Sequence, residues 1–463
     1  MSTVAKKILS AAMIAMVGLI AFAANAASSE FASAQLRGES DKDVYTAGET
    51  VTFTLHLEGA GEIPQGDFFI DYHLFDDDGK DARGRAPLPL PGGQLTLMTS
   101  IVQPGFVRLD AWIVDKDGRR MKGANPWNKA QELELFFYGG AAVEPEKLAI
   151  TIPEPADFDD YWARQKKCLA KVPPKVLFME EKPSVNKDVK IYAVGIAAPG
   201  RAIQPASAQV KDVQRVTGFL VVPADGRKVP GRVMFEGYGV HESRCPSWWI
   251  APDAVYFFVN AHGSELDKDK PYYDSWRESL NTKSADGKTT YTYGMNPVEN
   301  ANPDTAYFNG MVMRVLRALE YVKSRPEWDG RTLIVSGGSQ GGLQTTWAGA
   351  LDHDVTEVNL DIPWCCDIGC TTVNGIIPTW RLEWAKGLGY YDECSFAKRF
   401  PKTCKVTIHR AALGDELCPP KGVAAFYNAI ETQKKITWVQ GSNHGYAPPP
   451  PRQEFTFQAN DWK

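Results

Sequence analysis

The sequence predicts an α/β fold with a largely parallel sheet, preceded by a small all-β domain. From about residue 157 onward, short apolar runs that resemble strands alternate with longer segments that fit helices. This alternation is typical of a parallel sheet that is covered by helices on both faces. Before residue 139, apolar and polar residues instead alternate in several short stretches, which is typical of half-buried strands.

The predicted all-β domain covers residues 35–138. Alternating stretches lie at residues 51–57, 68–74, 95–99, 107–113 and 133–137, with turn signals such as Asp78-Gly79 and Asp117-Gly118 between them. Several short strands at this spacing predict an immunoglobulin-like sandwich. The Gly-Gly-Ala-Ala run at 139–142 predicts a linker over residues 139–147, so the α/β domain is expected to cover residues 148–463.

The first 26 residues predict a secretory signal peptide. Lys6 and Lys7 precede an apolar stretch over residues 8–23, and Ala-Asn-Ala follows at 24–26. We therefore expect a secreted or periplasmic protein with no membrane anchor after cleavage. Export permits disulfides, and the eight cysteines lack the paired spacing of a zinc site. Disulfides are thus expected, with Cys245 and Cys418 as candidate braces of functional loops.

The charge of the chain argues against nucleic acid as a partner. The formal net charge is −5 and the isoelectric point is about 5.9. A nucleic-acid-binding domain needs a basic patch, and none is evident here.

A candidate nucleophile, Ser339, lies in a glycine-rich turn. The apolar run 332–335 leads into Gly-Gly-Ser-Gln-Gly at 337–341, and a helix-compatible segment follows. Gly-x-Ser-x-Gly between a strand and a helix indicates the nucleophile elbow of α/β-hydrolases. The two outer glycines are needed because the sharp turn leaves no room for side chains at these positions.

The other members of a catalytic triad are expected in the order acid, then histidine. Asp415 follows the strand-like run 406–408, and His444 follows the run 435–439. Both would lie at the carboxyl ends of strands, where open α/β sheets place their sites. Because the pKa of histidine lies near neutral pH, its imidazole can act as a base there, and the carboxylate orients the ring. Glu416, next to Asp415, stays open as the acid.

The other histidines that we weighed are poorly placed for this role. His353 follows the elbow too soon for the last position of the triad, and His409 lies inside a strand. His56 and His73 belong to the predicted all-β domain. The oxyanion hole is expected from the backbone N–H of Gln340, the residue after the nucleophile, and that of Tyr238 in the turn Glu-Gly-Tyr-Gly at 236–239.

Four stretches of the second domain resemble the acetyl xylan esterase and cephalosporin C deacetylase group, carbohydrate esterase family seven. They are PADFDDYW at 155–162, FEGYG at 235–239, WDGR through GSQGG at 328–342, and GDELCPP at 414–420. The likeness covers roughly residues 150–446. It implies an α/β-hydrolase fold, a Ser339–Asp415–His444 triad, and no metal or cofactor.

Two motifs depart from the family. Its Arg-Gly-Gln is replaced by Ala261-His262-Gly263, and its His-Glu pair is His444-Gly445 here. These departures leave open both the substrate preference and the ring-like homo-oligomer of some members. His262 is a candidate for the substrate pocket, with the anchoring of a loop as the alternative. Trp248 and Tyr272 are candidates for stacking on sugar rings, with packing as the alternative.

The expected function is that of a secreted serine esterase which deacetylates xylan or xylo-oligosaccharides through an acyl-enzyme. Two alternatives remain open. A serine peptidase resembling prolyl oligopeptidase shares the Gly-x-Ser-x-Gly-Gly pattern, but the small N-terminal domain and the Cys-Pro-Pro sequence at 418–420 disfavour it. A non-catalytic carbohydrate-binding protein would keep the fold without the chemistry.

Overall fold

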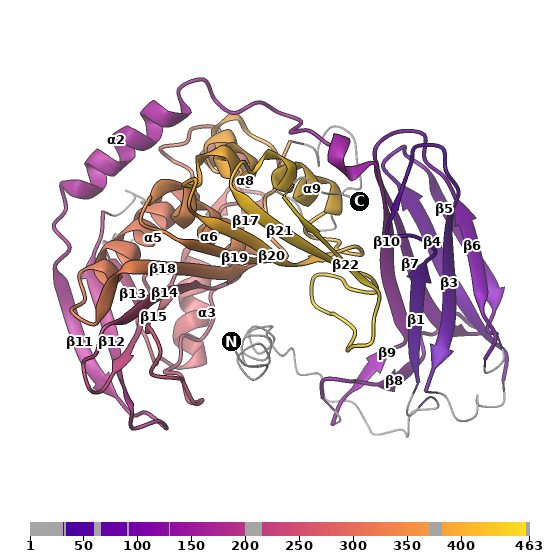
Figure 1. Ribbon diagram of the computed structural model, residues 1–463, viewed down its shortest axis with the longest axis horizontal. Helices are drawn as coiled ribbons and strands as arrows, with labels where there is room; N and C mark the ends of the chain where they lie inside the picture. The colour runs from indigo at the N-terminus through magenta and orange to yellow at the C-terminus, as the bar shows by residue number, and fades with distance from the viewer. Residues whose placement is uncertain are drawn as a thin grey trace.

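The computed structural model describes residues 31, 34–59, 66–89, 92–128, 130–199, 215–369 and 382–459. These residues form two bodies that lie side by side, an all-β body and a larger body of helices and strands (Figure 1). The predicted signal peptide and Cys370 lie outside the described residues.

The N-terminal body consists of two sheets that share one apolar core. One sheet has the order β1 (Gln35–Ser40), β3 (Val51–Glu58), β6 (Leu95–Thr99). The other has the order β2 (Val44–Tyr45), β10 (Phe136–Val143), β7 (Gly105–Asp115), β4 (Phe68–Asp76), β5 (Asp81–Pro87). A small hairpin, β8 (Lys122–Ala124) with β9 (Glu132–Glu134), lies beside them.

Alternation in the sequence explains this core. In β3, Val51, Phe53 and Leu55 are fully buried while the residues between them are partly exposed, and they join side chains of β4 and β7 in one cluster. The all-β prediction is therefore confirmed, and the immunoglobulin-like topology stays a prediction.

The predicted linker does not begin at residue 139. Residues 139–143 continue strand β10, pair with β7, and are buried. The glycines are needed for close packing rather than for flexibility, since a Cβ on Gly140 would lie 2.7 Å from the carbonyl oxygens of Leu413 and Val107. The connection to the second body is the short 3-10 helix η1 (Pro145–Lys147) and the segment after it.

The second body is built on a ten-stranded sheet. Its order is β11 (Val176–Lys182), β12 (Val189–Ala197), β13 (Arg215–Pro223), β15 (Val255–Asn260), β14 (Val229–Phe235), β18 (Trp328–Gly338), β19 (Glu357–Asp361), β20 (Lys405–Ala412), β21 (Gln433–Val439), β22 (Glu454–Gln458). The strands from β15 to β21 in this order are parallel, and the strands at both ends are antiparallel. The predicted α/β fold with a largely parallel sheet is confirmed.

Helices cover this sheet and position its loops. The longer ones are α2 (Phe158–Ala170), α3 (Lys270–Ser279), α5 (Tyr307–Lys323), α6 (Gln340–Leu351) and α9 (Pro420–Ala429), and the short ones are α4 (Pro297–Asn300), α8 (Glu393–Phe396), η2 (Lys386–Tyr390) and η3 (Ala397–Arg399). Every residue of α6 is buried, because it contacts β18 and β19 and is also covered by α5 and α8.

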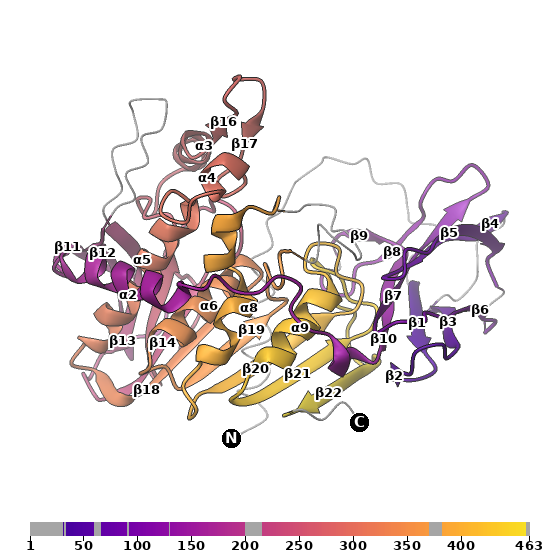
Figure 2. The ribbon, with the colours of Figure 1, turned by 90° about the horizontal axis from the view of Figure 1, so that it is seen from above.

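One group of elements projects beyond the sheet. Figure 2 shows α3, α4 and the hairpin of β16 (Thr282–Lys283) and β17 (Thr290–Tyr291) together at one edge of the molecule. Of the helices in the described part of the chain, none is both long and apolar enough to cross a membrane.

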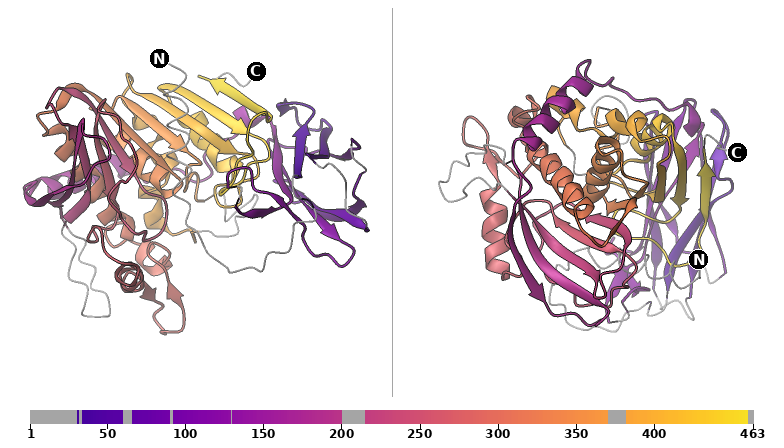
Figure 3. Two further views of the ribbon diagram at one scale, coloured as in Figure 1. Left: turned by 90° about the horizontal axis from the view of Figure 1, so that it is seen from below. Right: turned by 60° about the vertical axis from the view of Figure 1, so that its left-hand side comes forward.

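The two bodies meet along the strands β20 to β22, as both views of Figure 3 show. The side chain of Gln440 accepts a hydrogen bond from the N–H of Gly140 and donates one to its carbonyl, both at 2.9 Å. The side chain of Gln453 bonds the backbone of Ser40 in the same two-sided way, at 2.9 and 3.0 Å. These paired bonds imitate strand pairing and fix the all-β body against the segment between β21 and β22.

Candidate active site

Ser339 occupies a strained turn between β18 and α6. Its φ is 54° and its ψ is −123°, a conformation that non-glycine residues rarely adopt. A Cβ on Gly337 would lie 2.3 Å from the carbonyl oxygen of Gly341, and a Cβ on Gly341 would lie 2.4 Å from that of Phe235. The glycines two residues before and two after the serine are therefore required, as the sequence predicted for an elbow.

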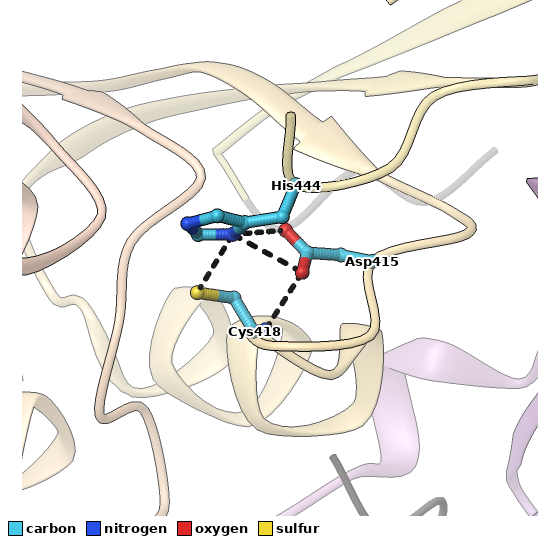
Figure 4. A group of neighbouring side chains, drawn as sticks. All are labelled: Asp415, Cys418 and His444. Carbon is cyan, nitrogen blue, oxygen red and sulfur yellow. Dashed lines mark hydrogen bonds and ion pairs between the residues drawn. The ribbon is translucent and has the colours of Figure 1, made fainter. Parts of the chain in front are cut away.

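Asp415 follows β20 and is held in a fixed orientation. Its side chain is 1% exposed, and its Oδ1 accepts the N–H groups of Leu417 and Cys418, both at 2.8 Å. The Nδ1 of His444 lies 3.1 and 3.2 Å from the two carboxylate oxygens (Figure 4). The neighbouring Glu416 is directed instead towards Arg108 of the all-β body, 4.0 Å away. His444 thus pairs with Asp415, which answers the question that the sequence left open.

The loop after β21 shapes the position of His444. Gly441 has a φ of 69°, which favours glycine, and the Oδ1 of Asn443 accepts the N–H groups of Gly445 and Tyr446 at 3.0 and 2.8 Å. This side-chain turn folds the backbone around His444. The N–H of Gly414 donates to the carbonyl of Ser442 at 2.9 Å. This bond directly joins the loop after β20, which holds Asp415 (the acid loop), to the loop after β21, which holds His444 (the histidine loop).

The pair is electrostatically suited to acid–base chemistry. Burial alone would raise the pKa of Asp415, but the charge and hydrogen bond of His444 and the two backbone N–H groups keep it below its ordinary value. Burial likewise lowers the pKa of His444, but Asp415 outweighs burial and the net pKa is raised. The carboxylate thus stays ionised and stabilises an imidazolium.

A chain of contacts through Arg410 joins the elbow to the histidine loop. The N–H of Ser339 donates to the carbonyl of Asp361 at 3.0 Å. The carboxylate of Asp361 receives two hydrogen bonds from Arg410, at 3.1 and 2.8 Å. Arg410 also donates to the carbonyl of Asn443, next to His444, at 3.4 Å.

The hydrogen bonds found between described residues join His444 to Asp415 but do not include one from the Oγ of Ser339 to His444. Catalytic hydrogen bonds are often long before substrate binds. The pairing of Ser339 with His444 therefore stays a prediction.

The two candidate oxyanion donors come from neighbouring parallel strands. Tyr238 follows β14 and Gln340 begins α6 just after β18, and these strands pair directly. The first N–H groups of a helix have no partner within it, so the N–H of Gln340 is suited to receive a charge. Tyr293 connects the two loops, because its hydroxyl accepts the N–H of Gly239 at 2.7 Å and donates to the side-chain oxygen of Gln340 at 3.0 Å.

His262 anchors the turn at 236–239, which carries the candidate oxyanion donor Tyr238. It is 2% exposed, its Nδ1 lies 2.8 Å from the hydroxyl of Tyr307, and its Nε2 lies 3.0 Å from the carbonyl oxygen of Gly239. Burial, with the charge of Arg314, lowers the pKa of His262 to about 3, so the ring is neutral. Of the two roles that the sequence allowed, the structure favours anchoring over lining the substrate pocket.

Trp248 and Tyr272 lie in segments that follow β14 and β15. Trp248 is 46% exposed and packs edge-to-face on Phe258, which lies against the apolar cluster of β12 and β13. The hydroxyl of Tyr272 accepts the N–H of Glu265 at 2.9 Å, and its ring stacks on Trp276 along α3. Their contact with a sugar stays a prediction.

The expected disulfides are not found among the described cysteines. All seven of them, including Cys245 and Cys418, are free thiols. Cys418 is 4% exposed and its Sγ lies 3.6 Å from the Nδ1 of His444 (Figure 4). The predicted export would permit disulfides, but it does not by itself bring two thiols within bonding distance.

Sequence reasoning missed three residues of this site: Asp361, Arg410 and Tyr293. A signal for two of them was present, since Asp361 is a charged residue at the end of β19 and Arg410 is one near the end of β20, and both are partly buried. A charge in such a position needs a partner. Tyr293 had no comparable signal, because it lies between β17 and α4, in a segment without periodicity.

Comparison with known proteins places these observations in a family context. The family model described as acetyl xylan esterase (AXE1) matches residues 147–373 and 381–460. The acetyl esterase Axe7A of Xylanibacter ruminicola is 25% identical over 307 residues, 63% of this chain and 64% of that relative, so the chain spans less than two thirds of its length. The crystal structure of acetyl xylan esterase 1 from Thermoanaerobacterium sp. JW/SL YS485 has a TM-score of 0.51 at 20% identity, covering 66% of this chain and 94% of that one. This likeness supports the α/β-hydrolase fold.

Proposed function

The chain belongs to the acetyl xylan esterase family, a family of carboxylic ester hydrolases, and from this membership we propose that it is a secreted serine esterase that removes acetyl groups from carbohydrate. One observation carries the serine mechanism: a buried carboxylate–imidazole pair follows β20 and β21, and the strained serine follows β18 in the same largely parallel sheet.

The proposed reaction begins with attack of the Ser339 hydroxyl on the acetyl carbonyl carbon. His444 accepts the serine proton at its Nε2, and Asp415 stabilises the resulting imidazolium through Nδ1. The N–H groups of Tyr238 and Gln340 stabilise the negative oxygen of the tetrahedral intermediate. His444 then protonates the leaving sugar alkoxide, and the acetyl group stays on Ser339. Water, deprotonated by His444, releases acetate.

The proposed substrates are acetylated xylan and xylo-oligosaccharides. The family match and the acetyl esterase relative support an acetylated carbohydrate. The exposed ring of Trp248 and the stacked ring of Tyr272 are the proposed sugar contacts. Secretion rests on the signal-like residues 1–26. N-terminal sequencing of the exported protein should begin at Ala27, and a retained Met1 would contradict export by this route.

The experiment that tests the activity compares ester and amide substrates. We expect the protein to hydrolyse p-nitrophenyl acetate and to release acetate from acetylated xylan, with far slower turnover of aminoacyl-nitroanilides. Preference for the anilide would favour the peptidase alternative. Ser339→Ala should abolish acetate release. An unchanged rate in this variant would show that Ser339 does no chemistry.

A further inference from the structure

Three metal-binding atoms converge beside the proposed catalytic base. An oxygen of Asp415, the Sγ of Cys418 and the Nδ1 of His444 all lie within 4.8 Å of one another. Figure 4 shows the sulfur of Cys418 and the carboxylate of Asp415 on two sides of the Nδ1 of His444, with dashed lines from both to this nitrogen. Cys418 takes no part in the proposed reaction through its thiol, which is free.

The separations of the oxygen and the sulfur from Nδ1 are close to those of a tetrahedral metal site, and the oxygen and the sulfur lie within 4.8 Å of each other. Zinc binds nitrogen and oxygen at about 2.0–2.2 Å and sulfur at about 2.3 Å. Tetrahedral angles then separate a nitrogen from an oxygen ligand by about 3.3 Å and a nitrogen from a sulfur ligand by about 3.5 Å. The observed separations from Nδ1 are 3.1 and 3.2 Å to oxygen and 3.6 Å to sulfur.

The charges of the ligand side chains, and the hydrogen bonds that hold Asp415 in place, also suit this site to a cation. A carboxylate and a thiolate would balance a divalent ion, and thiolate with imidazole favours soft or borderline metals such as Zn²⁺ over Mg²⁺ or Ca²⁺. Asp415 is already fixed by the N–H groups of Leu417 and Cys418. The side chain of His444 is 18% exposed, so this edge of the cluster is not sealed from solvent.

We propose that Asp415, Cys418 and His444 form an inhibitory binding site for a zinc-class divalent cation. Binding does not depend on the proposed function, and only the loss of activity rests on it. The ion would be coordinated by one carboxylate oxygen, the sulfur and Nδ1, with water as the fourth ligand.

The chemistry of inhibition follows from the two nitrogens of the imidazole. When the cation binds, the Cys418 thiol releases its proton to solvent and sulfur donates an electron pair to the metal. The lone pair of Nδ1 does the same, so the single proton of the neutral ring must reside on Nε2. A protonated Nε2 cannot accept the proton of Ser339. The metal therefore removes the base without blocking the serine itself.

Cadmium tests the binding directly, because a cadmium–thiolate bond absorbs in the near ultraviolet. Titration of the full chain with Cd²⁺ should produce this band at one equivalent, and Zn²⁺ should displace it. Cys418→Ser and Cys418→Ala should lose the band, whereas the matched variant Cys245→Ser should keep it. Thermal unfolding of each variant shows whether it is folded. A band that persists in folded Cys418→Ala would overturn the proposal.

Inhibition of the esterase activity provides a second test of the metal site. Zn²⁺ should inhibit hydrolysis of p-nitrophenyl acetate, and EDTA should restore it. The inhibition constant should rise at least tenfold in Cys418→Ser, with each protein compared to its own metal-free rate. Equal inhibition of both proteins would overturn the inhibitory role. A cadmium band that depends on Cys418 in a protein without esterase activity would instead contradict the proposed function and leave the metal site standing.

Discussion

At the scale of the single residue, Tyr293 connects the two loops of the proposed oxyanion hole through one hydroxyl group. This hydroxyl bonds both Gly239 and Gln340. Tyr293→Phe would leave the N–H of the partly buried Gly239 and the buried side-chain oxygen of Gln340 without this partner, at a cost of up to about 1–3 kcal/mol each. We expect kcat for p-nitrophenyl acetate to fall roughly tenfold to hundredfold. Tyr256→Phe is the control, since its hydroxyl bonds Asp253 at the start of β15. An unchanged kcat in Tyr293→Phe would contradict this role.

His262 should make the protein less stable in acid. Its pKa is about 3 in the folded protein and 6.5 ordinarily, so between these values the unfolded chain binds a proton that the folded chain does not. Stability is therefore lost as the pH falls, by about 3 kcal/mol from pH 6.5 to pH 4. His262→Gln removes this contribution. Denaturant unfolding at both pH values should show a smaller acid loss in the variant, and an equal loss would refute the assignment.

At the scale of the elements, Arg410 ties the ends of β19 and β20 to the histidine loop. Its planar fork makes two bonds to Asp361 and reaches Asn443. Arg410→Lys keeps the charge but cannot reproduce the fork. We expect kcat to fall about tenfold or more, with little change in KM, because His444 loses its support.

Arg399→Lys is a matched control for Arg410→Lys. Arg399 also makes a two-bond contact with a carboxylate, that of Asp159, but it lies after α8 in η3. Its substitution should leave kcat unchanged. Similar kcat values for the two lysine variants would show that Arg410 does not position the site.

The strands and turns that carry the proposed site were predictable, because the local sequence features at each of them indicate the same structure. The strand, the glycine spacing and the helix around Ser339 specify one turn, and Asp415 and His444 each follow an apolar strand. Residues 139–142 were mispredicted as linker because glycine marks both flexible chain and close packing. Sequence does not separate these cases, since the carbonyl of Leu413 that requires Gly140 is distant in the chain. The expected disulfides are not found among the described cysteines, since the export that permits them does not fix the distance between two thiols.

At the scale of the whole molecule, the all-β body contacts the loops after β20 and β21, which hold Asp415 and His444. Gly140 packs on Leu413 of the acid loop, and Arg108 faces Glu416. Phe136 packs edge-to-face on Tyr446, and the Trp127 ring N–H donates to the carbonyl of Ala447 at 2.9 Å. The all-β body therefore forms the outer support of the Asp415–His444 pair.

Weakening this support should reduce both stability and activity. Gln440→Leu leaves the buried N–H and carbonyl of Gly140 unpaired, which costs roughly 2–6 kcal/mol in total. We expect a lower Tm, faster proteolysis between the two bodies, and a reduced kcat. Gln453→Leu is the comparison, since it weakens the docking at Ser40, farther along the chain from the acid loop. A reduced Tm with unchanged kcat in Gln440→Leu would show that docking does not position the loops.

The measurement that tests the central claim most directly is the rate at which diethyl p-nitrophenyl phosphate labels Ser339, followed by mass spectrometry of the labelled peptide. An activated serine should take one label per chain, at Ser339. In His444→Ala the labelling rate should fall by about a thousandfold or more, because the serine loses its base. Labelling of another residue, or labelling of Ser339 at full speed in His444→Ala, would contradict the triad.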